Sequence, residues 1–589
     1  MPEGVQAQRW VLRRRPHPAL FDELRSVAPD PVLAQVLYAR KVDTPDKVRA
    51  FLHPEGPLAN PRDLAGVPEA VDRIARALRD GEEIVVYGDF DADGVCATTL
   101  LVAALREAGA ARVSPFVPDR FTDGYGLTLS ALENLHSTHP DARLVVTVDC
   151  GVRSPGEVEQ ARAMGLEMII TDHHELASDG DGALTLPAAI AVINPKREDS
   201  AYPFRDLAGV GVAYRLIDAL YAELGHSPDG QPLSPEPYLD LVALGTVADV
   251  VPLLDENRLL VLWGLQRMCT GARPGLRALM GVAGVTPSKV HSGDCGYRLG
   301  PRINAAGRLE TAAIAYQLLL AESDDVAQPL ASQLDAINQE RQQLLDAQLL
   351  MAEQQLGPID GRKILIVDSA ELHEGIVGLV ASRLADRYHR PALVIKHGDT
   401  TSRGSARSIA GFHIIEALDA HSALFERHGG HARAAGFTLV NENLGALRAA
   451  LADYADEHID AQMLLPRYEV DAIIPLEAVT EQTPVELARL GPFGEGNPQP
   501  ALATQNLVLK VVQSMGRDRQ HLRLQVTDGK RFLTGVFFRQ GALANTLRIG
   551  QSVDLIYRPE LNEWQGKTEL QLHVQALRPS SEQSREANA

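Results

Sequence analysis

The sequence predicts a mixed α/β protein of several domains. A doubly wound, mostly parallel sheet comes first, followed by a long connecting helix, a smaller α/β domain and a C-terminal β-barrel. From about residue 82, short β-branched runs alternate with helical stretches, which is typical of a parallel sheet with helices on both faces. Residues 312–356 are rich in the helix formers Ala, Leu, Gln and Glu. From about residue 465, apolar and polar residues alternate with a period of two, as in small barrels.

The length of 589 residues corresponds to roughly three to five domains. Changes of pattern along the chain give their predicted boundaries. We expect an N-terminal extension (1–70), a first α/β domain (71–310), a helical connector (311–357), a second α/β domain (358–462), an OB-like barrel domain (463–579) and a disordered tail (580–589).

The composition is that of a globular protein, with 45% hydrophobic and 23% charged residues. We find no apolar run near the roughly 18 residues that a membrane span needs, and no secretory signal at the N-terminus. Cys96, Cys150, Cys269 and Cys295 lie far apart with no CxxC pair, which indicates free thiols in a reducing compartment. The sequence therefore predicts a cytoplasmic protein with no membrane partner.

The net charge of −20 argues against a protein that coats duplex nucleic acid without specificity. The charge is uneven, however, because residues 501–580 hold more Lys and Arg than Asp and Glu. An acidic protein can therefore still hold a local basic track, and this basic balance favours an OB-like barrel at the C-terminal end.

The stretch "IVVYGDFDADG" (84–94) runs from an apolar strand directly into Asp89, Asp91 and Asp93. Three carboxylates this close repel one another unless a cation lies among them or water screens them. A calcium loop would need a glutamate at its twelfth position, where this chain has Leu100. Taken alone, the stretch fits either a cation site of another kind or a solvated turn between a strand and a helix.

Further acidic and histidine side chains follow other apolar runs of the first α/β domain. Asp149 follows "VVTV", and Asp172, His173 and His174 follow "MIIT". Asp249 ends the apolar stretch "LVALGTVAD". Each alone would more often be a helix cap or a turn residue. Because the carboxyl ends of parallel strands share one edge of a sheet, these groups could converge there.

Carboxylates with an imidazole form a ligand set suited to Mn²⁺ or Mg²⁺. The number of acids suggests two ions bridged by a shared carboxylate, and such pairs lie about 3.5–4 Å apart and promote displacement at phosphorus. The predicted chemistry is therefore hydrolysis of a phosphoester or phosphoanhydride.

The motifs "DFDADG", "VTVDCG", "DHH" (172–174) and "GTVAD" together resemble those of the DHH phosphoesterase superfamily. The downstream "GGHARAAGF" resembles the glycine-rich motif of the DHHA1 domain. Over nearly the whole chain, "LGPRINAAGR" (299–308), "HEGIVGLVASRL" (373–384) and "GPFGEGNPQP" (491–500) resemble the bacterial single-strand-specific exonucleases of that superfamily.

The resemblance implies five metal ligands, namely Asp91, Asp93, Asp149, His173 and Asp249. It implies that Asp149 bridges two ions and that Asp89 is a ligand or a close neighbour of one. His174 would donate to a phosphate oxygen, while Asp172 would orient the loop or a histidine.

A further set of residues is predicted to hold phosphate or the strand. It comprises Arg302, Asn304, Arg308, Arg403, Ser405, Arg407, Ser408, Gly429, Gly430, His431, Arg517 and Arg519. The planar arginine fork suits phosphate, and glycine allows close backbone approach. Salt bridges within "PRINAAGR", a solvated edge at 403–408 and a flexible turn at 429–431 are the competing interpretations. We expect Phe532, Phe537 and Phe538 in the barrel core, because they lie in an apolar strand.

The resemblance implies a metal-dependent 5′→3′ exonuclease that releases mononucleotides from single-stranded DNA in recombination and repair. A single-strand-binding protein and a RecQ-type helicase are the implied protein partners. Two alternatives remain: a DHH hydrolase of oligoribonucleotides, cyclic dinucleotides or polyphosphate, and a catalytically silent DNA-binding scaffold. A dinucleotide-dependent oxidoreductase is disfavoured because no GxGxxG opens the first strand–helix turn.

Overall fold

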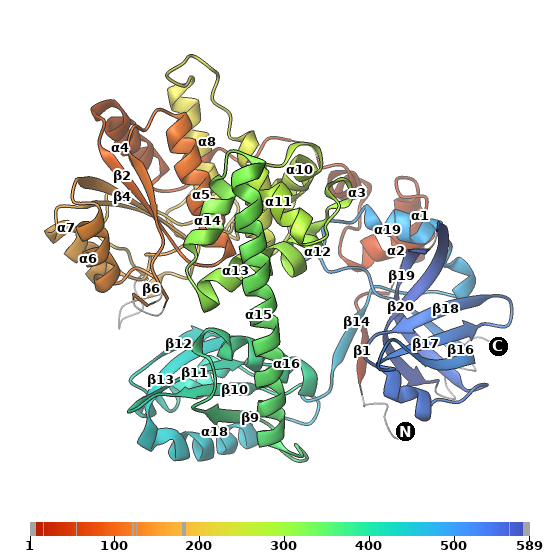
Figure 1. The fold of residues 1–589 in the computed structure, drawn as a ribbon. Helices are drawn as coiled ribbons and strands as arrows, with labels where there is room; N and C mark the ends of the chain where they lie inside the picture. Colours follow the sequence, from red (N-terminus) through yellow and green to blue (C-terminus); the bar gives the residue numbers. More distant parts are fainter. Residues whose placement is uncertain are drawn as a thin grey trace.

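The computed structural model describes residues 8–15, 17–54, 56–120, 123–124, 126–178, 184–564 and 566–580 (Figure 1). Residues 581–589 of the predicted disordered tail lie outside the described residues. No helix within the described ranges is both long enough and apolar enough to span a bilayer.

The first α/β domain is built on a five-stranded sheet in the order β3-β2-β4-β5-β8. A mostly parallel sheet was predicted, and every pairing in it is parallel. Its strands are β2 (Glu83–Gly88), β3 (Val113–Phe116), β4 (Ala142–Val148), β5 (Glu167–Thr171) and β8 (Ala191–Ile193). Alternate residues of β2 enter different cores, since Ile84 and Val86 belong to one and Val85 and Tyr87 to the other. The sheet is therefore covered on both faces, which is why its strands are apolar throughout.

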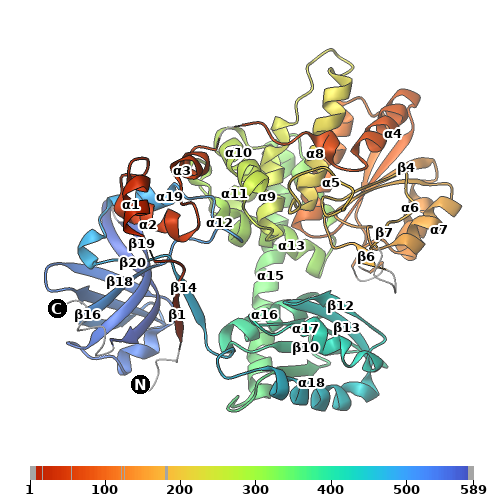
Figure 2. The ribbon, with the colours of Figure 1, turned by 180° about the vertical axis from the view of Figure 1, so that it is seen from behind.

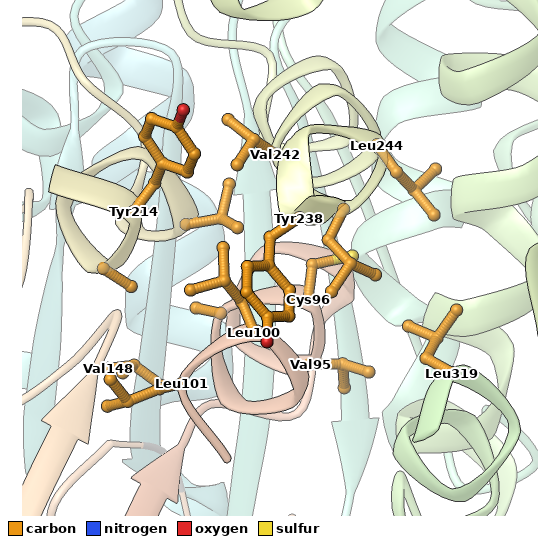
Figure 3. Packing of buried hydrophobic residues seen from close by; sticks show 14 of the residues in the cluster. Val95, Cys96, Leu100, Leu101, Val148, Tyr214, Tyr238, Val242, Leu244 and Leu319 are labelled. Carbon is orange, nitrogen blue, oxygen red and sulfur yellow. The ribbon is translucent and has the colours of Figure 1, made fainter. Parts of the chain in front are cut away.

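Helices cover the two faces of this sheet (Figures 1 and 2). The larger core contains residues of α4 (Val67–Asp80), α5 (Ala92–Glu107), α8 (Gly209–Leu224) and α9 (Leu239–Ala248), and the smaller core those of α6 (Leu129–Thr138) and α7 (Pro155–Ala163). Figure 3 shows Leu100 and Leu101 of α5 among side chains from several neighbouring elements. Burying each such leucine contributes roughly 1.5–3 kcal/mol, so α5 is a firmly anchored helix.

A helical layer follows the sheet in the sequence. It consists of α10 (Asp255–Gly271), α11 (Pro274–Val282), α12 (Ser292–Asp294), a π-helical turn (Cys295–Leu299), α13 (Gly300–Leu309), α14 (Ala313–Leu320) and α15 (Asp324–Leu356). The first half of α15 packs in the core of the first domain through Ala331 and Leu334. Its second half packs in the second domain through Leu345 and Ala352. The predicted long helix thus joins the two α/β domains rigidly (Figure 1).

The second α/β domain has a mixed sheet in the order β12-β13-β11-β10-β9, in which only β9 and β10 are parallel. Its strands are β9 (Leu365–Ser369), β10 (Ala392–His397), β11 (Thr401–Arg407), β12 (Arg427–His431) and β13 (Ala434–Val440). Its helices are α16 (Val377–Tyr388), α17 (Ile414–Asp419) and α18 (Leu444–His458). The segment "HGGHARAAGF" lies in the β12–β13 hairpin, so the alternative of a flexible turn at 429–431 is wrong. Paired glycines at the edge of a sheet carry no strand signal in the sequence.

The C-terminal barrel is closed, because β16 pairs with both β17 and β19. Its strands are β16 (Leu502–Met515), β17 (His521–Thr527), β18 (Phe532–Phe537), β19 (Ser552–Trp564) and β20 (Lys567–Pro579), and α19 (Gln482–Ala488) lies before them. Full closure leaves no unpaired sheet edge. The OB-like barrel predicted for this region is confirmed.

The N-terminal segment packs against the C-terminal barrel, although the two are far apart in the sequence. Strand β1 (Arg9–Leu12) pairs in parallel with β14 (Arg467–Val470), and α1 (Pro18–Arg25), α2 (Pro31–Ala39) and α3 (Pro45–Leu52) lie beside it (Figure 2). Leu24 and Leu37 belong to the same core as Leu502. Arg40 donates to Asp471 at 3.0 Å and to Asn497 at 2.8 Å, which fixes the segment in place.

Candidate metal centre

Acidic and histidine side chains from separate elements converge in the first α/β domain. Three groups each have ligand atoms within 4.8 Å of one another: Asp89, Asp91 and Asp149; Asp93, His173 and Asp249; and Asp149, His173 and His174. The neighbouring strands β2, β4 and β5 end directly before Asp89, Asp149 and the 172–174 loop. Asp149 belongs to two of the groups, which is the position a shared carboxylate would need.

The aspartates after β2 are fixed by the start of α5. Asp91 is the N-cap of this helix, and its Oδ1 accepts hydrogen bonds from the backbone N–H of Asp93 at 2.9 Å and of Gly94 at 3.1 Å. Capping satisfies amides that have no partner within the helix. Asp89 Oδ1 accepts from the Phe90 N–H at 2.7 Å. The alternating acids are therefore held by the helix start rather than by a calcium loop.

Asp93 is tied to the N-terminus of α8. Its carboxylate accepts from the N–H of Gly209 at 2.7 Å and of Val210 at 2.9 Å. The positive end of the helix dipole favours a carboxylate here. A side chain at Gly209 would collide with the centre, since an added Cβ would lie 2.7 Å from Asp149 Cβ.

Asp149 has a left-handed backbone with φ of 63°. Aspartate tolerates this conformation better than most residues. The N–H of Asp149 donates to Thr171 O at 2.9 Å, which continues the hydrogen bonding between β4 and β5 by one residue. The left-handed turn therefore orients a carboxylate at the end of a rigid strand.

Asp172 organises the histidine loop. Its carboxylate accepts from the N–H of His173 at 2.8 Å and of Val152 at 2.9 Å, and it lies 2.7 Å from His174 Nδ1. This is the orienting position expected for Asp172. Burial alone would raise the pKa of Asp172, but its hydrogen bond with His174 and further bonds lower it. Burial likewise opposes protonation of His174, yet the same bond raises the pKa of His174.

The carboxylates of the cluster are buried against one another. Asp89, Asp93 and Asp149 are each 1–2% exposed. Burial, together with the neighbouring Asp91 charge, raises the pKa of Asp89 to about 7 and the pKa of Asp93 to about 7. The pKa of Asp149 is raised well above its ordinary value by burial and the other acids. The uncompensated cluster is therefore unfavourable at neutral pH and calls for positive charge.

The histidine of the cluster stays neutral. Burial and the nearby His174 lower the pKa of His173 to about 3, which leaves a lone pair available for a metal. His173 Nε2 lies 3.0 Å from Asp149 Oδ1 and 3.6 Å from Asp249 Oδ2. Among the described residues, His173 Nε2 and Asp149 Oδ1 are buried without a hydrogen-bond partner. Buried atoms of this kind need a partner, and a divalent cation fits this donor set.

Asp249 reaches the cluster from a helix, which corrects the strand-end position expected for it. It is the C-cap of α9, not the residue after a strand. The run "LVALGTVA" is buried on nearly all sides, so its continuous apolar pattern does not distinguish a strand from a helix. Asp249 still converges with Asp93 and His173 as predicted, because α9 ends beside the carboxyl edge of the sheet.

Asn304 holds the aspartate loop in place. It lies in helix α13, where the sequence indicated only a polar segment, and its Oδ1 accepts from the Ala92 N–H at 2.7 Å. Gly307 of the same helix lies against Phe90, since an added Cβ would be 2.7 Å from Phe90 O. This face of α13 thus supports the backbone between Asp89 and Asp93.

We expect Asn304→Ala to weaken Mn²⁺ binding by about 10–100-fold, the usual cost of losing a partner that orients metal ligands. Isothermal titration calorimetry measures the change. The matched control is Asn134→Ala on the exposed side of α6. An affinity equal to that of the unmodified protein would show that the Asn304 contact does not position the ligands.

Arginine side chains gather beside the acids, where the two α/β domains meet. Arg308 Nη1 donates to Gly375 O at 3.1 Å, and an added Cβ at Gly375 would lie only 2.1 Å from Arg308 O. Burial, together with Arg120 and other nearby arginines, lowers the pKa of Arg308 to about 9. Burial also lowers the pKa of Arg407.

The predicted phosphate-binding residues of β11 divide into two sets. Arg407 Nη1 donates to Ser405 Oγ at 2.9 Å, and both lie against α16, since an added Cβ at Gly378 would be 2.9 Å from Arg407 Nη2. Arg403 instead pairs with Glu374 at 2.5 Å, and Ser408 Oγ donates to Phe412 O at 2.6 Å. Arg403 and Ser405 lie within β11, and Ser408 directly follows it.

Arg302 is paired with groups of the neighbouring helices. Its guanidinium lies 2.8 Å from Asp335 of α15 and donates to Arg298 O at 2.6 Å. This is the structural salt bridge weighed as the competing interpretation. Arg302 therefore secures α13 to α15 and supports Asn304 indirectly.

The hairpin of the second domain lies near the histidine loop. Gly429 and Gly430 pair with Gly436 and Ala435. The pKa of Glu175, which follows the histidines, is lowered first by its hydrogen bond with Lys196 and further by the charge of His431. The hairpin thus faces the loop across the domain boundary.

Two cations near the cluster were not predicted. The Arg120 guanidinium carbon lies 4.0 Å from the centroid of the Phe90 ring, and its charge acts on Asp89. Lys196 lies 2.8 Å from Glu175 and acts on Asp249. Neither follows a recognisable motif; only their places after strands β3 and β8 could have indicated them.

The barrel presents basic side chains on its surface. Arg517 and Arg519 lie in the exposed β16–β17 loop, and no ion pair involves either within the described ranges. Phe532 and Phe538 are 58% and 49% exposed, so the prediction that they lie in the core is wrong. Phe537 does pack against the barrel core. Leu533 and Phe537 of β18 face the barrel core, while Phe532 belongs to the alternate, outward-facing set and Phe538 follows the end of the strand.

Comparison with known proteins identifies the family. Residues 83–246 match the model of the DHH family N-terminal domain, 361–457 that of the DHHA1 domain, and 470–576 that of the RecJ OB domain. A single-stranded-DNA-specific exonuclease RecJ from Dickeya dadantii is 38% identical over 591 residues, covering 96% of this chain and 99% of the relative.

Solved structures agree with these matches. RecJ from Thermus thermophilus in complex with Mn²⁺ has a TM-score of 0.83 at 30% identity, covering 99% of this chain and 80% of that one. The same protein in complex with Mg²⁺ has a TM-score of 0.78 at 30% identity, covering 97% and 79%. With its acid–histidine cluster, its three matched domains and these full-length relatives, the chain belongs to the RecJ family of DHH proteins.

Proposed function

We propose that the protein is a metal-dependent exonuclease that removes mononucleotides from single-stranded DNA in the 5′→3′ direction during recombination and repair. The observation that carries this proposal is the buried acid–histidine cluster in a chain of the RecJ family. Its relatives are described as single-stranded-DNA-specific exonucleases and have been solved with Mn²⁺ and Mg²⁺.

The candidate ligands are Asp91, Asp93, Asp149, His173 and Asp249, with Asp89 beside them. When bound there, two Mn²⁺ or Mg²⁺ ions would supply an activated water and neutralise charge on the scissile phosphate. The protein holds the ligand side chains in a rigid arrangement through the hydrogen bonds of Asp91, Asp93 and Asp172. Asp172 holds His174 by its Nδ1, so the other ring nitrogen is available to donate to a phosphate oxygen.

The arginines beside the cluster suit a terminal phosphate. Arg308 and Arg407 are half-buried, and no carboxylate pairs with either in the described part of the chain. Partial burial without a carboxylate partner makes such cations favour an anionic ligand. With Ser405 as an additional donor, these side chains would bind the 5′ phosphate and place the adjacent phosphodiester at the metal centre.

The barrel would hold the strand away from the site of chemistry. Arg517, Arg519, Arg523 and Arg539 are exposed, and the exposed ring of Phe538 lies 5.2 Å from that of His521. Basic side chains with neighbouring aromatic rings are a common arrangement for binding single strands.

We expect Arg517→Ala with Arg519→Ala to raise KM for a long single strand several-fold without changing kcat. The residues are exposed on the barrel and are not part of the metal centre. If both contact phosphate, the slope of log Kd against log salt should fall by about 1.4. The control is Arg49→Ala with Arg162→Ala, two exposed arginines on α3 and α7. An unchanged salt slope would exclude the loop from the strand path.

The direct test uses strands labelled at the 5′ or the 3′ end, with Mn²⁺ or Mg²⁺ present. The proposal requires immediate release of labelled mononucleotide from the 5′ label, a ladder from the 3′ label, and loss of both with a chelator. Intact duplex should resist. Equal rates on dinucleotides and long strands would favour a small-substrate hydrolase, and metal-independent binding without turnover would favour a silent scaffold.

A single-strand-binding protein and a RecQ-type helicase are proposed partners on the strength of the family resemblance alone. The substrate chemistry supports them, since one covers single strands and the other produces them. Co-sedimentation with the full-length protein tests each.

A further inference from the structure

The side chain of Tyr297 is exposed to solvent, and its backbone belongs to a π-helical turn. Its exposed fraction of 86% exceeds that of every other exposed large hydrophobic residue described. It lies in the π-helical turn Cys295–Leu299. Among the described residues, no hydrogen bond or ring contact involves its phenol. Turns of this kind occur frequently at functional sites.

The π-helical turn packs against the helix that delivers Asp249. An added Cβ at Gly296 would lie 3.5 Å from Val247 Cγ1, and one at Gly300 would lie 3.0 Å from Ala248 Cβ. Both contacts fall within the last two residues of α9, directly before Asp249. The turn then continues into α13, which carries Asn304. Tyr297 is thus an exposed residue of a turn that packs on the end of α9, directly before the ligand Asp249.

The barrel lies on the other side of Tyr297. Burial lowers the pKa of Arg558 of β19, and the Tyr297 phenol lies near enough to act on that pKa as a smaller influence. Arg558 Nη1 donates to Gln499 Oε1 at 2.8 Å, while its Nε is buried and has no hydrogen-bond partner among the described residues. Lys289 and Glu563 form a 3.3 Å ion pair between the same two domains. Figures 1 and 2 both place α12, directly before the turn, on the side of the first domain that faces the barrel.

We propose that Tyr297 is a platform on which a base of the single strand stacks between the barrel and the metal centre, with Arg558 adding positive charge nearby. This inference rests on the proposed function. A single strand offers free base faces, whereas duplex bases are already stacked on both sides. Stacking on an aromatic side chain accepts any base, so Tyr297 would favour single strands without selecting a sequence.

The test combines substitutions of Tyr297 with strands that lack a single base. Binding of a labelled oligonucleotide is measured by fluorescence anisotropy in the Asp149→Asn background, which keeps the strand intact. Tyr297→Ala is expected to weaken binding about tenfold, and Tyr297→Phe to restore it. The matched control is Leu350→Ala, exposed on α15. Strands with one abasic position, moved stepwise from the 5′ end, locate the stacked base.

The inference requires that one abasic position weakens binding to the Tyr297 protein but costs nothing further in Tyr297→Ala. Additive losses at every position, or binding of Tyr297→Ala equal to that of the Leu350→Ala control, would overturn it. So would a lowered Tm of Tyr297→Ala that accounts for the whole loss. If the unmodified protein hydrolyses no strand while the coupling is present, the nuclease proposal fails and Tyr297 stands as a strand-binding residue.

Discussion

Asp149→Asn is expected to lower the rate of strand hydrolysis by at least about a thousandfold, which corresponds to roughly 4 kcal/mol of transition-state stabilisation. Asp149 contributes ligand atoms to two of the three groups in the cluster. Asparagine keeps the size of the side chain but removes the charge that two cations would share. Asp149 shares one group with Asp89 and Asp91, and its Oδ1 also lies 3.0 Å from His173 Nε2.

Initial rates of mononucleotide release with Mn²⁺ measure this effect. Asp141→Asn is the matched control, since Asp141 is 74% exposed at the other end of the same strand region. Asp149→Asn also removes one of several buried negative charges that repel one another. In the presence of chelator, the Tm of Asp149→Asn should therefore be at least that of the unmodified protein. A rate within tenfold of the unmodified protein would mean that Asp149 is not a shared ligand.

Gly209→Ala is expected to lower kcat/KM by about a hundredfold, a loss near 2.7 kcal/mol. The added Cβ would lie 2.7 Å from Asp149 Cβ and 2.8 Å from Asp149 Oδ1. Because Gly209 also donates its N–H to Asp93 at 2.7 Å, relief of the collision would displace both carboxylates. Steady-state kinetics at several Mn²⁺ concentrations would show the loss together with a raised metal requirement.

The control for this change is Gly281→Ala in α11, where an added Cβ meets nothing within 4 Å. Alanine there should preserve the rate and add up to about 1 kcal/mol of stability through helix propensity. Full activity of Gly209→Ala would show that the start of α8 can shift without disturbing the metal centre.

The sequence predicted the centre wherever its residues follow parallel strands. Asp89, Asp149 and His173 come from adjacent strands, and the carboxyl ends of such strands meet at one edge whatever the loops do. Asp249 was assigned the wrong element, because a run buried on all sides has no periodicity that separates a strand from a helix. An acidic side chain at the end of an apolar segment nevertheless indicated correctly that Asp249 lies with the other acids.

Features set by distant contacts could not be predicted. The bond of Arg302 to Asp335 and the packing of Leu37 beside Leu502 depend on tertiary partners. A helical period shows which face is buried but not what it packs against. Phe538 was misplaced for a related reason, since an apolar residue just past the end of a strand can lie on either side of the barrel wall. Exposed aromatic rings have no signature of their own.

Three acidic segments, which contain Asp89 to Asp93, Asp149 and Asp249, together with the His173 imidazole, are proposed to hold divalent cations at the site of chemistry. Anomalous diffraction from crystals grown with Mn²⁺, recorded at the manganese absorption edge, tests this proposal most directly. We expect two anomalous peaks, one beside Asp89, Asp91 and Asp149 and one beside Asp93, His173 and Asp249. A map without a peak among these residues, or with manganese bound only elsewhere on the molecule, would contradict it.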